Sequence, residues 1–110
     1  MNTLIFAAAL ALAAGPPSPA AAIPTIHVKG FAYVPAVLTV SAGTTVRFVN
    51  DDSEAHTVTA DDKSFDSAGL DTGDTWTCRF AAAGKFSYFC QLHPYMRGTI
   101  VVRPTKGTAV

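Results

Sequence analysis

The chain has 110 residues, which suits one small domain, and eight acidic residues balance eight lysines and arginines. The basic residues form no cluster, so the composition argues against nucleic-acid binding. All eight carboxylates fall between Asp51 and Asp74, where Lys63 is the one basic residue. This acidic window is expected to be either a set of solvated loops or a negatively charged surface.

The first 22 residues are expected to be a secretory signal peptide. Residues 1–14 form an apolar run that is too short for a comfortable membrane span. A proline-rich stretch follows at residues 15–19, and residues 20–22 are alanines, which a signal peptidase accepts. An uncleaved anchor or a buried helix is the alternative, because no Lys or Arg precedes the apolar run. Export, to the periplasm or beyond, is therefore expected, with no stable membrane insertion after cleavage.

From residue 23 onward the chain alternates between short apolar segments and turn residues. Each segment has the period of two that is typical of a strand, and valine, threonine and aromatic residues are frequent. Turn residues such as Ser41-Ala42-Gly43 separate the segments, and no long segment has a helical period. The expected strands lie around residues 26–28, 37–40, 46–48, 56–59, 75–80, 86–90 and 100–102.

This pattern predicts an all-β fold. About seven to eight short strands in so small a domain indicate a two-sheet antiparallel β-sandwich of the Greek-key type. The domain is expected to cover residues 23–104, followed by a C-terminal tail at residues 105–110. So small a core is only marginally stable by itself, and a bound metal ion would add to its stability.

Four side chains that bind metals occur at a spacing that predicts one site. Cys90-x-x-His93-x-x-Met96 stands at the end of one predicted strand and in the loop before the next. The strand fixes Cys90, and the two-residue gaps let a tight loop bring His93 and Met96 back toward the same point. Pro94 stiffens that loop by fixing its own backbone angle. His56, which lies 34 positions before Cys90 at the start of an earlier predicted strand, supplies a second imidazole.

One thiolate, two imidazoles and one thioether make a donor set that suits copper, with a trigonal His₂Cys plane and a weak axial methionine. Each residue alone has a plainer explanation, as a core cysteine, a surface histidine or a packing methionine. Their joint spacing favours the metal site. The thioether argues against zinc, and three histidines in the whole chain are too few for a multi-copper reaction centre. His27 lies on the polar side of the first predicted strand and is expected to be exposed and inert.

Over residues 25–103 the sequence resembles the cupredoxins, and in particular their plastocyanin and amicyanin branch. The ligand loop at residues 90–96 is similar to the short loop of amicyanins, and the segments at residues 50–52, 56–59, 65–67 and 84–86 also resemble this branch. Many members carry Asn directly after the first histidine ligand. Here that position is Thr57, whose hydroxyl is expected to replace part of the bracing of the ligand loop.

The resemblance implies a one-electron carrier that is not an enzyme and that binds one copper ion per chain. The implied ligands are His56, Cys90, His93 and Met96. The expected partners are redox proteins, such as a c-type cytochrome, a dehydrogenase or a reductase, and the carrier is expected to be monomeric. A copper delivery or buffering protein that uses the same site is the alternative.

Two surfaces are candidates for docking, with loop packing as the alternative for the first and scattered loop carboxylates as the alternative for the second. Three residues around His93 should form an apolar patch: Leu92, Pro94 and Tyr95. Asp61, Asp62 and Asp66 should lie on the flank near Phe89, whose side chain points outward because Tyr88 and Cys90 alternate with it. These carboxylates would steer a positively charged partner toward the site.

Cys78 and Cys90 are not expected to form a disulfide. In a hairpin Cys78 would lie opposite about Ser87, roughly 10 Å along the strand from Cys90, whereas a disulfide needs Cα atoms within about 7 Å. If the two strands instead face each other across the sandwich, Cys78 is in mid-strand and Cys90 at an end. Cys78 is therefore expected to be a buried free thiol beside Trp76 and Phe80.

Overall fold

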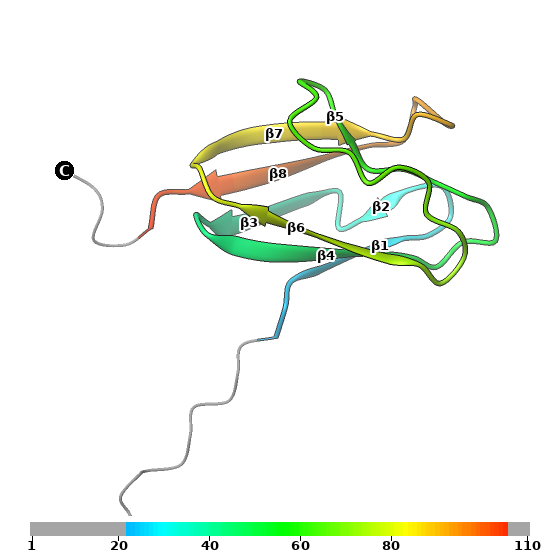
Figure 1. Cartoon of the computed structure of the whole chain (residues 1–110), viewed down its shortest axis with the longest axis horizontal. Coiled ribbons are helices and arrows are strands. Elements are labelled where there is room, and N and C mark those ends of the chain that lie inside the picture. The colour runs from blue at the N-terminus through cyan, green and yellow to red at the C-terminus, as the bar shows by residue number, and fades with distance from the viewer. Residues whose placement is uncertain (1–21, 106–110) are drawn as a thin grey trace, which may run out of the picture.

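The computed structural model describes residues 22–105, and eight strands in this part of the chain form two facing sheets (Figure 1). The first sheet has the order β2-β1-β4-β6 and comprises β1 (Thr25–Val28), β2 (Tyr33–Val34), β4 (Thr44–Asn50) and β6 (Thr75–Phe80). The second has the order β3-β8-β7-β5 and comprises β3 (Val37–Ser41), β5 (Thr59–Ala60), β7 (Gly84–Phe89) and β8 (Arg97–Arg103).

The predicted sandwich is confirmed, but its sheets are mixed rather than wholly antiparallel. β1 pairs in parallel with β4, and β3 pairs in parallel with β8. The cause is the connection between β3 and β4, which are joined by a tight turn at Gly43 yet belong to different sheets. β3 and β4 therefore do not pair with each other, and each joins its own sheet, with β3 beside β8 and β4 between β1 and β6.

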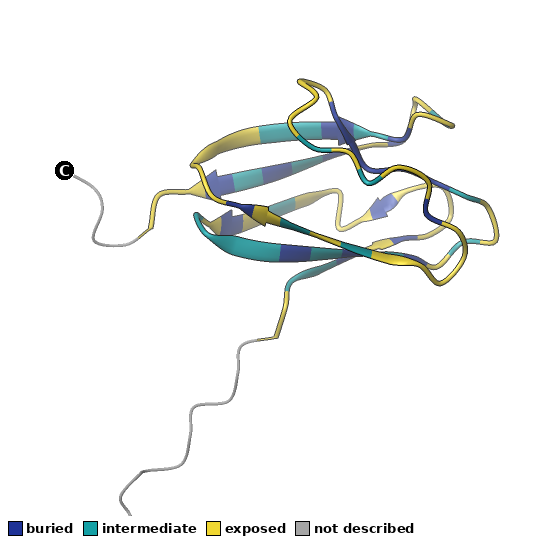
Figure 2. Cartoon of the chain, viewed as in Figure 1, coloured by how far each residue is buried: buried dark blue, intermediate teal, exposed yellow. Residues whose placement is uncertain are grey.

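The core lies between the sheets, and buried residues alternate with more exposed ones along the long strands β4 and β8 (Figure 2). Val46 and Phe48 of β4 and Ile100 and Val102 of β8 are buried, as their period of two predicts. The remaining buried core includes Ile26, Val28, Tyr33, Val40, Val58, Leu70, Phe80 and Tyr88.

Gly98 makes room for the largest buried side chain of the core. Gly98 pairs with Tyr88 across β7 and β8, and a Cβ atom on Gly98 would lie 2.3 Å from the Tyr88 hydroxyl. Such a contact is impossible without a shift, so any residue other than glycine at this position would displace the Tyr88 ring. Tyr88 in turn precedes the predicted ligand Cys90 by two positions on β7.

The strand predicted around His56 is shorter than expected. β5 covers only Thr59–Ala60, while His56 forms an isolated bridge with Leu70. The chain between β4 and β6 is mostly loop (Figure 1), which agrees with the solvated-loop interpretation of much of the acidic window. No helix with the length and apolar character of a membrane span occurs among the residues described.

The predicted domain at residues 23–104 lies within the described part of the chain. The predicted signal peptide, residues 1–22, lies outside the described residues apart from Ala22. The predicted tail at residues 105–110 lies outside them apart from Thr105.

Candidate metal centre

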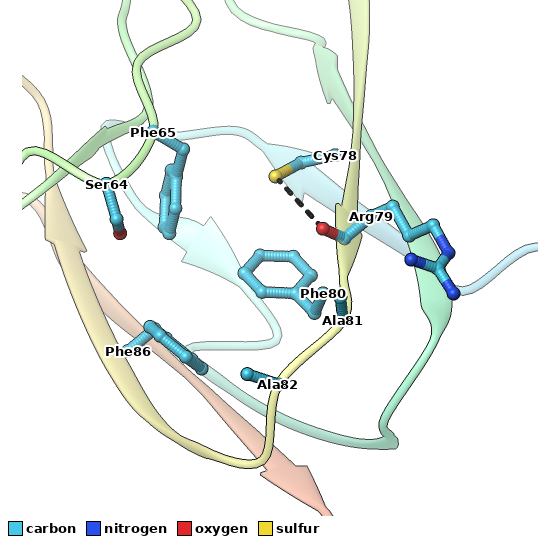
Figure 3. Close-up of a pocket in the computed structure, with 8 residues that line it drawn as sticks. All are labelled: Ser64, Phe65, Cys78, Arg79, Phe80, Ala81, Ala82 and Phe86. Carbon is cyan, nitrogen blue, oxygen red and sulfur yellow. Dashed lines mark hydrogen bonds between the residues drawn. The ribbon is translucent and has the colours of Figure 1, made fainter.

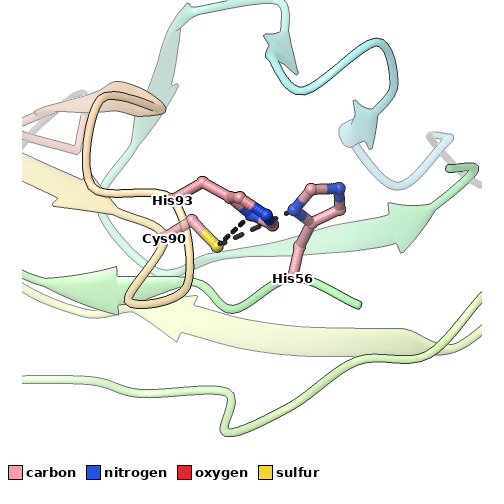
Figure 4. A group of neighbouring side chains, drawn as sticks. All are labelled: His56, Cys90 and His93. Carbon is pink, nitrogen blue, oxygen red and sulfur yellow. Dashed lines mark hydrogen bonds between the residues drawn. The ribbon is translucent and has the colours of Figure 1, made fainter. Parts of the chain in front are cut away.

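Three of the four predicted ligands converge on one point (Figure 4). One ligand atom from each of His56, Cys90 and His93 lies within 4.8 Å of the other two. The Cys90 Sγ atom is 3.7 Å from His56 Nδ1 and 3.7 Å from His93 Nδ1. His56 and Cys90 are fully buried, whereas His93 is half-buried and reaches the surface.

The ligand loop closes through turn hydrogen bonds at each of its two gaps. The His93 N–H donates to the Cys90 carbonyl at 3.2 Å, and the Met96 N–H donates to the His93 carbonyl at 2.8 Å. The Cys90 N–H then donates to the Met96 carbonyl at 3.2 Å, which joins the two ends of the loop. Met96 is 2% exposed and packs in the core. A spacing of three residues therefore suits this loop because each step is one hydrogen-bonded turn.

His56 is held by its backbone and by its ring. Its N–H and carbonyl exchange hydrogen bonds with Leu70 at 3.0 and 2.8 Å. Its Nε2 atom lies 2.8 Å from Asp52 Oδ2. An ionised carboxylate can only accept, so Nε2 carries a proton, and Nδ1 is the ring nitrogen that faces Cys90.

Asp52 was not predicted from the sequence to belong to the site. Burial alone would raise the pKa of Asp52, but hydrogen bonds from the backbone of Phe31 and Gly30 and from the His56 ring lower it below its usual value. The signal in the sequence was a carboxylate four positions before a predicted histidine ligand. That spacing indicates a contact only when the loop between Asp52 and His56 is known to bring the two side chains together.

Thr57 braces the ligand loop as predicted. Its Oγ1 atom accepts a 2.8 Å hydrogen bond from the Gln91 N–H, and it also contacts Thr59 Oγ1 at 3.0 Å. The backbone N–H of Thr57 donates to Cys90 Sγ at 3.3 Å. The first of these hydrogen bonds confirms the role expected for the hydroxyl.

Phe31 also contacts the site, a contact that was not predicted from the sequence. Its ring packs edge-on against His56 and His93, with ring centroids 5.2 and 4.8 Å apart. It belongs to the turn between β1 and β2, far from the ligand loop in sequence, so no local pattern points to it. The expected patch residues around His93 are all exposed, and two of them are large hydrophobics: Leu92 at 56% and Tyr95 at 72%.

The comparison with protein families agrees with this geometry. The model of the cupredoxin-like domain matches residues 3–102. The chain belongs to the cupredoxin-like family. This cupredoxin is 28% identical over 82 residues to amicyanin from Paracoccus versutus. The aligned region covers 70% of this chain and 62% of amicyanin. It is 31% identical over 84 residues to chloroplastic plastocyanin from Chlamydomonas reinhardtii. The aligned region covers 64% of this chain and 58% of plastocyanin. The chain thus spans less than two thirds of these curated relatives.

A solved structure matches the fold more completely. The purple cupredoxin from Nitrosopumilus maritimus is 30% identical and superposes with a TM-score of 0.68. The match covers 72% of this chain and 98% of that one.

The second cysteine of the cupredoxin lies apart from the metal centre. Cys78 and Cys90 are both free thiols, and β6 and β7 lie in opposite sheets, so the absence of a disulfide is confirmed. Cys78 is half-buried rather than buried and lines an apolar pocket with Phe65, Phe80 and Phe86 (Figure 3). β6 is an edge strand, and the facing edge strand β5 has only two residues, which leaves this side of the sandwich partly open. Burial raises the pKa of the Cys78 thiol.

His27 is exposed, as predicted, but it is not without contacts. Its Nδ1 atom lies 2.6 Å from Asp51 Oδ2, and just over half of the imidazole is accessible. Neither residue contacts His56, Cys90 or His93 in any hydrogen bond of the described residues. Asp51 lies one position before Asp52 and is therefore a useful reference for it.

The acidic flank lies beside Phe89, as expected, but one of its charges is paired. Thr59 is the cross-strand partner of Phe89, and Asp61 follows it by two positions. Arg97 donates a hydrogen bond to Asp61, and its guanidinium lies 5.8 Å from the centroid of the half-buried Phe89 ring. Hydrogen bonds from Ser64 lower the pKa of Asp62, whose carboxylate stays exposed.

Proposed function

We propose that this cupredoxin is a one-electron carrier that binds a single copper ion through His56, Cys90, His93 and Met96. The observation that carries the proposal is the convergence of one sulfur and two imidazole nitrogens within 4.8 Å. This soft donor set, with no carboxylate among the converging atoms, fits copper in both of its oxidation states. Bound copper supplies a one-electron couple between Cu(I) and Cu(II).

The protein contributes a rigid and dry site. His56 and Cys90 are fully buried and exclude water from one side of the centre. The closed loop from Cys90 to Met96 and the Thr57 hydroxyl hold the remaining donors in place. A site that is fixed by so many hydrogen bonds is expected to change little between oxidation states, which keeps electron transfer fast.

His93 is proposed as the port for electrons. It is half-buried, and its ring contacts Phe31, which is 38% exposed. Exposed Leu92, Pro94 and Tyr95 extend this apolar surface around the histidine. Redox proteins are proposed to dock here, and the short distance from a docked partner to His93 would favour electron transfer.

The wider role follows from the same site. One group of converging metal-binding side chains is present among residues 22–105, and the whole chain has three histidines, so we propose a carrier rather than a multi-copper enzyme. We further propose an exported, periplasmic monomer that exchanges electrons with redox proteins such as a c-type cytochrome, a dehydrogenase or a reductase. The predicted signal peptide supports the location.

Copper loading followed by visible spectroscopy tests the proposal. The oxidised protein is expected to be strongly coloured by charge transfer from the Cys90 thiolate. Cys90→Ser should be colourless, whereas the matched Cys78→Ser variant should keep the colour. A colourless wild type, or a coloured Cys90→Ser variant, would show that the assignment is wrong. Stopped-flow electron exchange with a cytochrome c, together with resistance of the copper to chelators, separates a carrier from a copper delivery protein.

A further inference from the structure

We propose that Asp52 is a positioning residue of the metal centre, which fixes the His56 ring with Nδ1 toward Cys90 and makes His56 a stronger ligand for Cu(II). The positioning of the ring stands on the contacts of this chain alone. The effect on copper rests on the proposed function.

The Asp52 carboxylate joins three parts of the chain. Its Oδ1 atom accepts a 2.7 Å hydrogen bond from the Gly30 N–H, and its Oδ2 atom accepts one of 2.9 Å from the Phe31 N–H. The same Oδ2 atom lies 2.8 Å from His56 Nε2. The Asp52 side chain is 12% exposed and the His56 side chain is 0% exposed, so water competes little for this contact.

Asp52 is itself held in place, so it can orient the ring. Its backbone N–H donates to Asn50 Oδ1 at 2.9 Å, and its carbonyl accepts from Thr72 Oγ1 at 2.7 Å. Asn50 is fully buried, and its Nδ2 group donates to the carbonyls of Glu54 and Leu70, both at 2.8 Å. Since Leu70 also pairs with the His56 backbone, one network fixes both the carboxylate and the histidine.

Two consequences follow for His56. A carboxylate on Nε2 fixes the tautomer that leaves the Nδ1 lone pair free, and it makes the imidazole a stronger electron donor to a metal ion. The added negative charge near the centre favours the more highly charged Cu(II) over Cu(I), so Asp52 is expected to lower the reduction potential.

The same carboxylate also places the aromatic cover of the site. Gly30 and Phe31 both have positive φ angles, of 63° and 58°. This backbone conformation is unfavourable for Phe31 because Phe31 has a Cβ atom. The two hydrogen bonds to Asp52 stabilise this turn, and the turn brings the Phe31 ring against His56 and His93. Asp52 therefore contacts the predicted ligand His56 directly and also positions Phe31, whose ring packs against both His56 and His93.

The test compares Asp52→Asn with Asp51→Asn. Both changes remove one carboxylate from adjacent positions, but Asp51 contacts the exposed His27 and not a ligand. Nitrogen NMR of the copper-free wild type at mildly alkaline pH should show His56 with its proton on Nε2. Asp52→Asn should give a mixture of tautomers, and Asp51→Asn should match the wild type.

Copper-loaded protein provides the second measurement. Asp52→Asn is expected to lose about tenfold in affinity for Cu(II) relative to Cu(I), within the range for outer partners of metal ligands. For a one-electron couple this is a rise of about 59 mV in reduction potential. Asp51→Asn should shift the potential much less, and Asp52→Glu, which keeps the charge, should stay closer to the wild type than Asp52→Asn.

The outcomes separate this inference from the proposed function. A wild-type His56 with its proton on Nδ1 overturns the inference, even if no variant folds. Equal potentials for the two Asn variants, in protein that binds copper and is coloured, also overturn it while the carrier proposal stands. A fixed tautomer that is lost only in Asp52→Asn supports the positioning role, and a wild type that binds no copper then contradicts the proposed function alone.

Discussion

The hydroxyl of Thr57 accepts a 2.8 Å hydrogen bond from the backbone N–H of Gln91. Thr57 directly follows His56, and Gln91 directly follows Cys90, so this single bond ties together two predicted ligands that are 34 positions apart. The Thr57 N–H adds a second link by donating to Cys90 Sγ at 3.3 Å. Thr57 therefore connects the segment that contains His56 to the end of β7, where Cys90 and the ligand loop begin.

Replacing Thr57 with the isosteric Val should weaken this junction. The Gln91 N–H would lose its acceptor in a partly buried place, and the free energy of unfolding should fall by about 1–3 kcal/mol. Urea unfolding of the copper-free protein measures the change. The exposed Thr39 on β3 provides the control, because Thr39→Val breaks no link to the ligand loop. Equal stability of Thr57→Val and wild type would contradict the bracing role.

Met96→Leu should keep copper and raise the reduction potential. Met96 is buried in the core, and Leu has a similar volume, so the fold should lose under about 1.5 kcal/mol. The potential rises because a weak donor that favours Cu(II) is lost, while His56, Cys90 and His93 remain. Metal analysis and voltammetry measure the two effects. Complete loss of copper would show that Met96 holds the metal rather than tuning it.

The sequence predicts what depends on local pattern and leaves out what depends on how loops meet. The period of two in β4 and β8 and the spacing Cys90-x-x-His93-x-x-Met96 are both local, and the structure shows the strands and the closed loop. The parallel pairing of β1 with β4 follows from the chain changing sheets, which no periodicity records. Asp52 and Phe31 reach the site only because separate loops fold over the same end of the sandwich.

Cys78 should react slowly with alkylating reagents near neutral pH. Burial raises the pKa of this thiol, and the thiolate is the reactive form. In a Cys90→Ser background, Cys78 is the remaining cysteine. Its rate of labelling by iodoacetamide should increase with pH, and the pH at which this increase occurs should be higher than for a free thiol. Rates equal to those of the unfolded chain at every pH would contradict this.

The same shift links Cys78 to stability in alkaline solution. Because the folded state favours the neutral thiol, the contribution of Cys78 to stability is fully present below the pKa of the unfolded thiol. It is lost as the pH rises through the higher pKa of the folded state. Cys78→Ala should lack this part of the fall in the free energy of unfolding at alkaline pH. Urea unfolding of both proteins at increasing pH measures the difference.

Arg97 is expected to limit electrostatic steering on the flank beside Phe89. Its guanidinium pairs with Asp61, so the flank carries less net negative charge than Asp61, Asp62 and Asp66 would give alone. Arg97→Gln should therefore speed association with a cationic redox partner by roughly twofold to tenfold at low ionic strength, because exposed charges act mainly on the association rate. Asp62→Asn should slow it. Stopped-flow measurements over a range of salt concentrations should give a steeper salt dependence for Arg97→Gln than for the wild type.

Arg103→Gln is the matched control for this prediction. Arg103 lies at the opposite end of β8 from Arg97 and is also exposed, so its loss changes the net charge equally but away from the metal centre. If both variants change the rate by the same factor, net charge alone is responsible. If neither changes the salt dependence, the flank does not steer the partner. The apolar surface formed by Phe31, Leu92, Pro94 and Tyr95 around His93 must then provide the docking by itself.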